Sequence, residues 1–372
     1  MTWQPELRGF SLSDESAQLT SSEIEAISRR LDAIEAMIAR RSALVADGVL
    51  GATALPSGNW DPHKPQVYQP DGDAGTFMSS FSLVMRRDPE IIGKLRLYAQ
   101  AFSGYQLATL SPAVHRPWIR EKLPANYDIF LSMLAGGPEE GVAKFLKVAA
   151  SLPENYRISF PAKFGEIGWI YDDLILNRDT YMYLERICLM YECGLLPRLI
   201  RESQARTVRI VEIGSGFGGL AYIMKRLLPN AHFVLIDLPE SLAFCHPYLS
   251  TLFPDVPHAL VTVAGQAVAE ESGFTYVANF DATTLDLVDV DLVINTLSFA
   301  ELDVAQVLEY CNLIKTWLAP GSLFFEQNFN SSPHAKKDLF NTIGSVLSEP
   351  RELQSAIIDR LEKGTPRLWS VG

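Results

Sequence analysis

The segment Arg209 to Gly219, with the sequence RIVEIGSGFGG, contains the residues whose types and spacing most clearly suggest chemistry. Its apolar residues predict a buried strand, and its glycines predict a tight turn whose backbone N–H groups can approach a ligand closely. Glu212 stands two residues before Gly214, the first glycine. A second predicted strand ends at Asp237, where a carboxylate can hold ribose hydroxyls. The pattern therefore predicts a site for a nucleoside cofactor.

The type of cofactor is indicated by the acid that precedes the glycines. Gly214, Gly216 and Gly219 have the spacing G-x-G-x-x-G of NAD sites. NAD would place its pyrophosphate at this helix N-terminus, where Glu212 would repel it. S-adenosylmethionine (SAM) contains an ammonium, a sulfonium and no phosphate. The pattern E-x-G-x-G-x-G, which includes Gly218, resembles the first motif of class I SAM-dependent methyltransferases. SAM is therefore the predicted cofactor, with an NAD-dependent oxidoreductase as a weaker alternative.

We expect the cofactor to contact the ends of three strands, because open α/β sheets bind ligands outside the carboxyl ends of their strands. Glu212 would act on the ammonium through the turn or through water. Asp237 would hold the ribose, with Leu238 beside the adenine. Asn279 and Phe280 would read and cover the adenine, or are merely a strand end. The predicted cofactor-binding residues of these strand ends are Glu212, Gly214, Ser215, Gly216, Gly218, Asp237, Leu238, Asn279 and Phe280.

The fourth predicted strand ends at Asn295 and is followed by Glu301, next to the expected position of the methyl group. Methyl transfer is an in-line displacement that needs an aligned nucleophile, and a hydroxyl nucleophile also needs a base. Glu301 is the predicted catalytic base, and Asn295 is predicted to orient the substrate. The alternative for Glu301 is a structural carboxylate at a helix N-terminus. His246 and His334 are alternative bases.

The fifth predicted strand ends in Glu326, Gln327 and Asn328, which we expect to line the pocket of the methyl acceptor. Asp289 and Asp291 flank the fourth strand, but no D-x-D or paired-carboxylate motif is present. The sequence therefore predicts no metal site.

Alternating strand and helix patterns from residue 208 onward predict a mostly parallel sheet with helices on both faces. The expected fold class is α/β: a Rossmann-like class I methyltransferase sheet, preceded by a mainly helical N-terminal region. The final RLWSVG is compatible with an antiparallel edge strand, and the segment 259–263 with a further strand. The predicted strands are 208–213, 232–237, 274–279, 291–296 and 321–327, and the predicted helices are 218–228, 240–252, 301–318 and 335–348.

The N-terminal region, residues 1–170, is predicted to be a cap or oligomerisation region that precedes the methyltransferase domain at 171–372. A helix is expected from Thr20–Ser22 onward, where capping-box spacing occurs. Its stripe of apolar residues fits either a short coiled coil, and hence a homodimer, or packing on its own domain. A loop is expected at 48–75, where three aromatic side chains either line a substrate entrance or anchor the loop. The stripe consists of Ile24, Ile27, Leu31, Ile34 and Ile38, and the aromatic residues are Trp60, His63 and Tyr68.

Composition restricts the class of protein. The 372 residues are 48% hydrophobic and 20% charged, with a net charge of -12, and no apolar run reaches the ~18–20 residues that span a bilayer. The acidic balance argues against a nucleic-acid binder, which needs a basic face. The N-terminal residues lack a signal-peptide pattern, and the four cysteines form no C-x-x-C pair. We expect a cytoplasmic protein with reduced thiols, no membrane partner and no nucleic-acid partner.

Several motifs together resemble the bacterial sugar O-methyltransferase family. They are EIGSGFGG from Glu212, DLPE from Asp237 and NTLSFAEL from Asn295, preceded by GEIG at 165–168 and YLER at 183–186. The similarity covers residues 160–330, with leucine where methionine commonly follows the glutamate of the third motif. The resemblance implies SAM-dependent methylation of a hydroxyl on a sugar or sugar-containing small molecule. The alternatives are a non-sugar natural-product hydroxyl or amine as the acceptor, and a non-catalytic protein that senses SAM.

The same resemblance implies that the segment before the sheet folds over the cofactor. Tyr171, Asn177, Asp179 and Thr180 would then lie near the pocket, and Thr180 completes the predicted cofactor-binding set. The residues alone allow a different interpretation, in which Asp179 and Thr180 simply cap the helix predicted at 180–191.

Overall fold

The computed structural model describes residues 10–11, 19–51, 54–55, 92–93, 95–99, 138–329, 338–348, 350–358 and 364–371. His334 and the aromatic residues Trp60, His63 and Tyr68 lie outside the described residues, as does most of the expected loop at 48–75.

The described residues form a central sheet of eight strands in the order β10-β11-β9-β8-β4-β5-β7-β6. The six strands from β9 to β6 run parallel, and β11 pairs antiparallel with both β9 and β10. The chain leaves β4 toward β5 and later returns to β8 on the other side of β4, so the topological switch point lies between β4 and β8. The bounds are β4 Val208–Ile213, β5 Ala231–Asp237, β6 His258–Leu260, β7 Gly273–Ala278, β8 Val290–Thr296, β9 Leu318–Gln327, β10 Arg351–Glu352 and β11 Pro366–Ser370.

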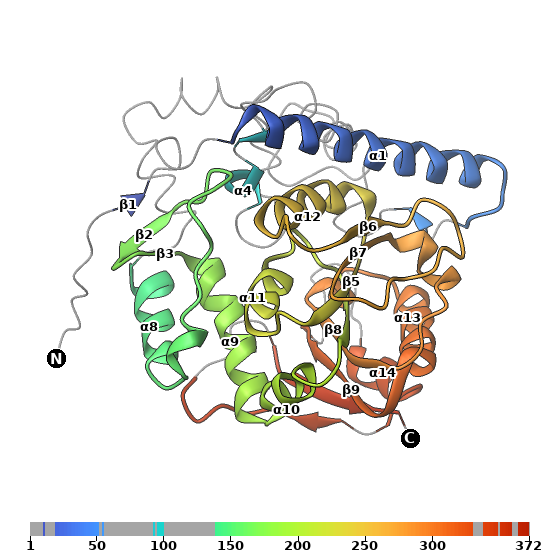
Figure 1. Ribbon diagram of the computed structural model, residues 1–372. Helices are drawn as coiled ribbons and strands as arrows, with labels where there is room; N and C mark the ends of the chain where they lie inside the picture. Colours follow the sequence, from blue (N-terminus) through green and yellow to red (C-terminus); the bar gives the residue numbers. More distant parts are fainter. Residues whose placement is uncertain are drawn as a thin grey trace, which may run out of the picture.

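Helices cover both faces of this sheet, because side chains along each strand alternate between two apolar cores. Ile210 of β4 packs in the core with α9 to α12, whereas the next residue, Val211, packs in the core with α13 and α14. Figure 1 shows these layers. The helices and short 3₁₀ turns are α9 Arg178–Glu192, α10 Leu195–Ser203, α11 Gly219–Leu227, α12 Pro239–Leu252, η5 Asn279–Thr284, η6 Ser298–Ala300, α13 Val304–Trp317 and α14 Leu339–Gly344.

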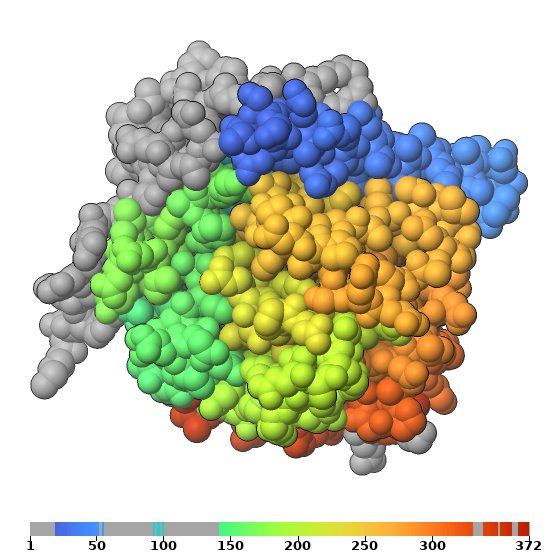
Figure 2. All heavy atoms as spheres, in the orientation of Figure 1, coloured from blue at the N-terminus to red at the C-terminus, as the bar shows by residue number. Residues whose placement is uncertain are grey.

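The N-terminal region contributes the long helix α1, Ser21–Ala46, which begins at a capping box formed by Thr20 and Glu23. Its apolar stripe packs on the chain's own core. Figures 1 and 2 show α1 lying along α12. A small antiparallel sheet, β1-β2-β3, lies beside this region. The remaining elements are β1 Phe10–Ser11, α4 Leu95–Tyr98, η3 Pro138–Ala143, α8 Lys144–Ala149, η4 Glu154–Tyr156, β2 Gly168–Tyr171 and β3 Leu174–Leu176.

The predicted fold class is confirmed, and the five predicted strands are present with ends shifted by at most three residues. The final segment forms β11, but β10 lies outside it, so it is not the edge strand that we expected. The segment at 259–263 forms the short strand β6. The helix expected at 301–318 begins only at Val304, because Asp303 caps it and a 3₁₀ turn comes first. The described part of 335–348 contains only the short helix α14. The division of the chain at residue 170 stays a prediction.

Within the described ranges, no helix combines the length and apolar character needed to cross a membrane.

Candidate functional site

The glycine-rich turn after β4 needs its glycines for conformation and for space. Gly214, Gly216 and Gly218 have φ angles of 78°, 55° and 86°, a region that other residues rarely adopt. A Cβ atom on Gly214 would lie 2.3 Å from Oγ of Ser298, which belongs to the segment after β8. The turn is therefore packed tightly against the end of a neighbouring strand, across the switch point of the sheet.

Asp237 at the end of β5 is held by backbone groups. Its carboxylate accepts hydrogen bonds from the N–H groups of Gly216 and Leu238, each at 2.7 Å. Removal from bulk water raises the pKa of Asp237 to about 7, the two N–H groups oppose this rise, and the negative charge of Glu301 adds to it. Gly216, Asp237 and Leu238 are half-buried among buried neighbours, so this strand end stays accessible.

Glu212 is buried one residue before the end of β4. Burial and, to a smaller extent, the negative charge of Asp237 raise the pKa of Glu212 to about 8, against the lowering effect of the Arg186 cation. Three acids flank the glycine turn: Glu212 precedes it on β4, Asp237 accepts a hydrogen bond from the N–H of Gly216, and Glu301 bonds to Ser298, which packs against Gly214. The predicted residues Glu212, Asp237 and Glu301 are thus brought together.

Asn295 at the end of β8 has a fully used side chain. Its Nδ2 donates to the carbonyl oxygen of Ile213 at 2.9 Å and to Oγ of Ser298. Its Oδ1 accepts from the N–H of Phe299 at 3.3 Å and from Nδ2 of Asn328 at 2.9 Å. With both donors and both acceptor positions used, Asn295 locks two loops together. Orientation of the substrate by Asn295 stays a prediction.

Glu301 lies just beyond this locked segment and is half-buried. The chain reaches it through Leu297, a non-glycine residue with a φ of 69°, and through the short turn η6. Leu297 donates its N–H to the carbonyl oxygen of Gln327 at 2.9 Å, and Glu301 donates its own to that of Ser298 at 2.9 Å. A strained residue held by neighbouring strands is a common feature of functional sites.

The polar side chains at the end of β9 are bonded to other elements of the fold. Glu326 forms an ion pair with Arg367 of β11 at 3.1 Å. Gln327 donates to Glu185 of α9 at 2.8 Å, and Asn328 donates to Glu326 at 2.9 Å. All three side chains are buried. Their bonds within the protein leave less of their polar surface for an acceptor than we expected from the sequence.

The end of β7 meets the N-terminal helix. Asn279 donates to the carbonyl oxygen of Ala54 at 3.2 Å. Arg40 forms an ion pair with Asp281, and its guanidinium carbon lies 5.0 Å from the centroid of the Phe280 ring. The predicted adenine subsite therefore lies against Arg40, in the last part of α1, and against Ala54, which follows the helix.

A second ion pair joins α1 to the start of α12, which follows β5 in the chain. Nη1 of Arg41 donates to Glu240, in the first turn of α12, at 3.0 Å, and both side chains are buried. Arg41 is not among the site residues predicted above, although the sequence contains a signal for it. Position 41 continues the spacing of the apolar stripe three residues after Ile38, so a charged residue at that position predicts a buried ion pair.

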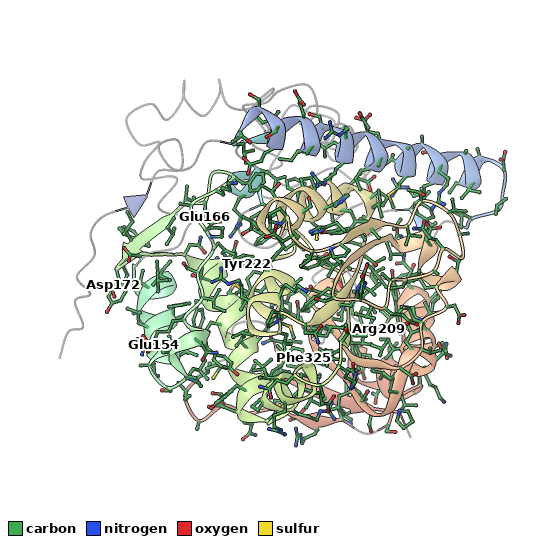
Figure 3. The ribbon with its side chains drawn as sticks, in the orientation of Figure 1. Glu154, Glu166, Asp172, Arg209, Tyr222 and Phe325 are labelled. Atoms are coloured by element: carbon green, nitrogen blue, oxygen red, sulfur yellow. The ribbon has the colours of Figure 1, made fainter. Side chains whose placement is uncertain are left out.

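The segment before the sheet forms a buried cluster around Arg96. This side chain pairs with Glu166 at 2.6 Å and with Asp179 at 2.7 Å, and its guanidinium carbon lies 4.0 Å from the centroid of Phe217 in the glycine turn. Figure 3 labels Glu166 in this segment. Sequence analysis did not select Arg96.

Thr180 is engaged at the start of α9. Its hydroxyl donates to the carbonyl oxygen of Asn177 at 2.6 Å, and Asn177 caps the helix. Thr180 is thus part of the capping box, but the N-cap is Asn177, and Asp179 pairs with Arg96 instead of capping the helix. Contact of Thr180 with a cofactor stays a prediction. Tyr171, at the end of β2, lies in the small sheet.

His246 does not fit the role of a base at the strand ends. It lies in α12 with its ring centroid 4.3 Å from that of Tyr276. Burial lowers the pKa of His246 to about 3. Among the described residues, no group of three potential ligands could hold a metal ion.

No protein-family profile matches the sequence, and no curated protein sequence matches it. Solved structures with local similarity include human N-acetylserotonin methyltransferase in complex with SAM, at 12% identity, a TM-score of 0.32 and coverage of 52% of this chain and 56% of that chain. Another is an O-methyltransferase family protein from Burkholderia thailandensis, at 11% identity, a TM-score of 0.32 and coverage of 52% and 60%. A 16S rRNA methyltransferase of T. thermophilus in complex with SAM and guanosine matches at 13% identity, a TM-score of 0.34 and coverage of 51% and 42%.

The chain thus spans between 42% and 60% of the length of these neighbours. The similarity identifies neither an acceptor nor a catalytic residue of this chain.

Proposed function

We propose that this protein is a SAM-dependent O-methyltransferase. The observation that carries the proposal is the group of three acids, Glu212, Asp237 and Glu301, around a turn of glycines with positive φ. Carboxyl groups favour a cationic ligand, beside which they ionise, and disfavour the pyrophosphate of a dinucleotide. The backbone of the turn and the carboxylate of Asp237 match the needs of a ribose and an amino-acid group, so these residues fit SAM better than NAD.

Each strand end would hold one part of SAM. The turn at Gly214 and Gly216 would approach the methionine part, and Glu212 would balance its ammonium. Asp237 would accept hydrogen bonds from the ribose hydroxyls, while Phe280 and Asn279 would bound the adenine. When bound, SAM supplies a methyl group on a positively charged sulfonium, which makes that carbon electrophilic.

Glu301 would serve as the base that takes the proton of the acceptor hydroxyl. The support is that Glu301 bonds to Ser298, which packs against Gly214 in the turn where SAM would bind. A base must be within hydrogen-bond reach of the proton that it removes, and the half-buried position of Glu301 leaves it accessible to an acceptor. Asn295 would support this arrangement by holding the loop that leads to Glu301.

For the acceptor, we propose a hydroxyl of a sugar or a sugar-containing small molecule. The support is the resemblance of the motifs DLPE and NTLSFAEL to the sugar O-methyltransferase family. The alternative is a hydroxyl or amine of a non-sugar natural product.

Calorimetric titration with S-adenosylhomocysteine, NAD and NADH tests the cofactor. We expect micromolar binding of S-adenosylhomocysteine alone. Binding of NAD alone would overturn the proposal and the charge argument for Glu212. The acceptor is tested next with isotopically labelled SAM and panels of sugars, sugar nucleotides and aromatic alcohols, where label transfer only to the aromatic panel would remove the sugar assignment.

A further inference from the structure

The helix α9 lies directly against the glycine turn and the carboxyl ends of the strands. A Cβ atom on Gly219, the first residue of α11, would lie 2.5 Å from the ring of Tyr183. Two residues further along α9, Glu185 accepts a hydrogen bond from Gln327 at the end of β9 at 2.8 Å. One turn of α9 therefore faces both the turn after β4 and the end of β9.

The same turn of α9 carries a buried cation, Arg186. Its side chain is fully buried, and its guanidinium carbon lies 5.8 Å from the centroid of the Tyr183 ring. Nη1 donates to the carbonyl oxygen of Met182 at 2.8 Å. Burial lowers the pKa of Arg186, and the nearby charges of Glu185 and Glu212 oppose that change.

The charges around the turn then match both ends of an amino acid. The amino-acid part of SAM has an ammonium and a carboxylate on one carbon atom. A site with the acids Glu212 and Asp237 alone would attract the first group and repel the second. A guanidinium next to Tyr183, the residue that packs against Gly219, removes this conflict, because its planar fork can bind a carboxylate through two parallel hydrogen bonds.

We propose that Arg186 binds the α-carboxylate of the cofactor, opposite Glu212 at the ammonium. This inference rests on the proposed function and adds to it a recognition residue for the amino-acid part of the ligand. It also gives the YLER segment of α9 a role in cofactor binding in addition to its packing role.

The test compares two ligands that differ only in the carboxylate: S-adenosylhomocysteine and its decarboxylated form, which keeps the ammonium. We expect the wild type to bind the first about 10–150-fold more tightly, as for a charged hydrogen bond. Arg186→Gln should lose most of this preference while its affinity for the decarboxylated ligand changes by less than about threefold. The matched control is Arg198→Gln, a half-buried arginine of α10 that bonds to Gly321, which should keep the wild-type preference.

Two results would overturn the inference: a wild type that binds both ligands equally, or an Arg186→Gln variant that weakens both equally. If Arg186→Gln does not fold, Arg186→Lys replaces it, since lysine keeps the charge but not the fork. It should weaken binding of S-adenosylhomocysteine alone, and equal weakening of both ligands would again overturn the inference. A wild type that binds neither ligand would instead contradict the proposed function itself.

Discussion

The ends of β5 and β8 use similar polar residues in opposite ways. At the end of β5, two backbone N–H groups hold the carboxylate of Asp237, and the residue stays half-buried. At the end of β8, Asn295 is fully buried and bonds to four groups of the protein. The first arrangement presents a charge to a ligand, whereas the second fixes the loop that leads to Glu301. Substitutions at the two ends should therefore change different properties.

The largest effect is expected at Glu301, which follows the locked end of β8. Glu301→Gln removes the proposed base while keeping the size of the side chain. Turnover should fall by about 10²–10⁴-fold, while the dissociation constant of S-adenosylhomocysteine stays within a few-fold of the wild-type value. Single-turnover methyl transfer and calorimetry measure the two quantities. Loss of cofactor binding with unchanged turnover at saturation would reverse the assignment.

The next effect concerns Asp237, which should act on binding. Asp237→Asn removes the negative charge from the end of β5 and should weaken binding of S-adenosylhomocysteine by about 10–150-fold, because a charged hydrogen bond contributes ~1.5–3 kcal/mol. Calorimetric titration measures this change. An unchanged dissociation constant would mean that Asp237 does not contribute to ligand binding, so the ends of β5 and β8 would not differ in that property.

Asn295 should act on stability instead. Asn295→Ala leaves the buried Nδ2 of Asn328 and the carbonyl oxygen of Ile213 with fewer partners, at a cost of ~1–3 kcal/mol in the free energy of unfolding. Urea denaturation measures the loss. A variant that keeps wild-type stability and loses affinity for an acceptor would instead support the predicted role of Asn295 in orienting the substrate.

The smallest effect is the pH dependence of binding. The pKa values of Asp237, about 7, and Glu212, about 8, lie above their ordinary values, so both groups hold protons near pH 6. A ligand with an ammonium favours their ionised forms, so affinity should rise between about pH 6 and pH 8, by about tenfold in total for each unit by which the bound ligand lowers either pKa. Calorimetry in buffers of different ionisation enthalpy counts these protons. Asp237→Asn should release about one fewer, and an unchanged count would remove Asp237 from the linkage.

The sequence predicts the features of this site that are local. The turn requires glycine at 214, 216 and 218, and the strand ends follow from the alternation of apolar runs and turns, so Glu212 and Asp237 could be placed at one edge of the sheet. The capping of α9 by Asn177 and of α1 by Thr20 depends only on residues within one turn. Such features need no knowledge of how distant segments meet.

The features that the sequence left out depend on distant partners. The role of Asn295 is determined by Asn328 and Ile213, which lie 33 and 82 residues away. Arg96 meets Asp179 across 83 residues, and nothing in the spacing of either residue specifies the other. Polar residues at a strand end therefore predict where a site lies better than they predict which side chains bind a ligand.

The ion pair between Arg41 and Glu240 also has a consequence for folding during synthesis. Its two residues are 199 positions apart, so a ribosome that adds about 5–20 residues per second needs roughly 10–40 s between them. Helix α1 has local signals that let it form early, but the surface on which its apolar stripe packs is completed only when α12 has been made. The nascent chain therefore exposes this stripe for most of that interval, so a chaperone that binds apolar surfaces would protect α1 during synthesis.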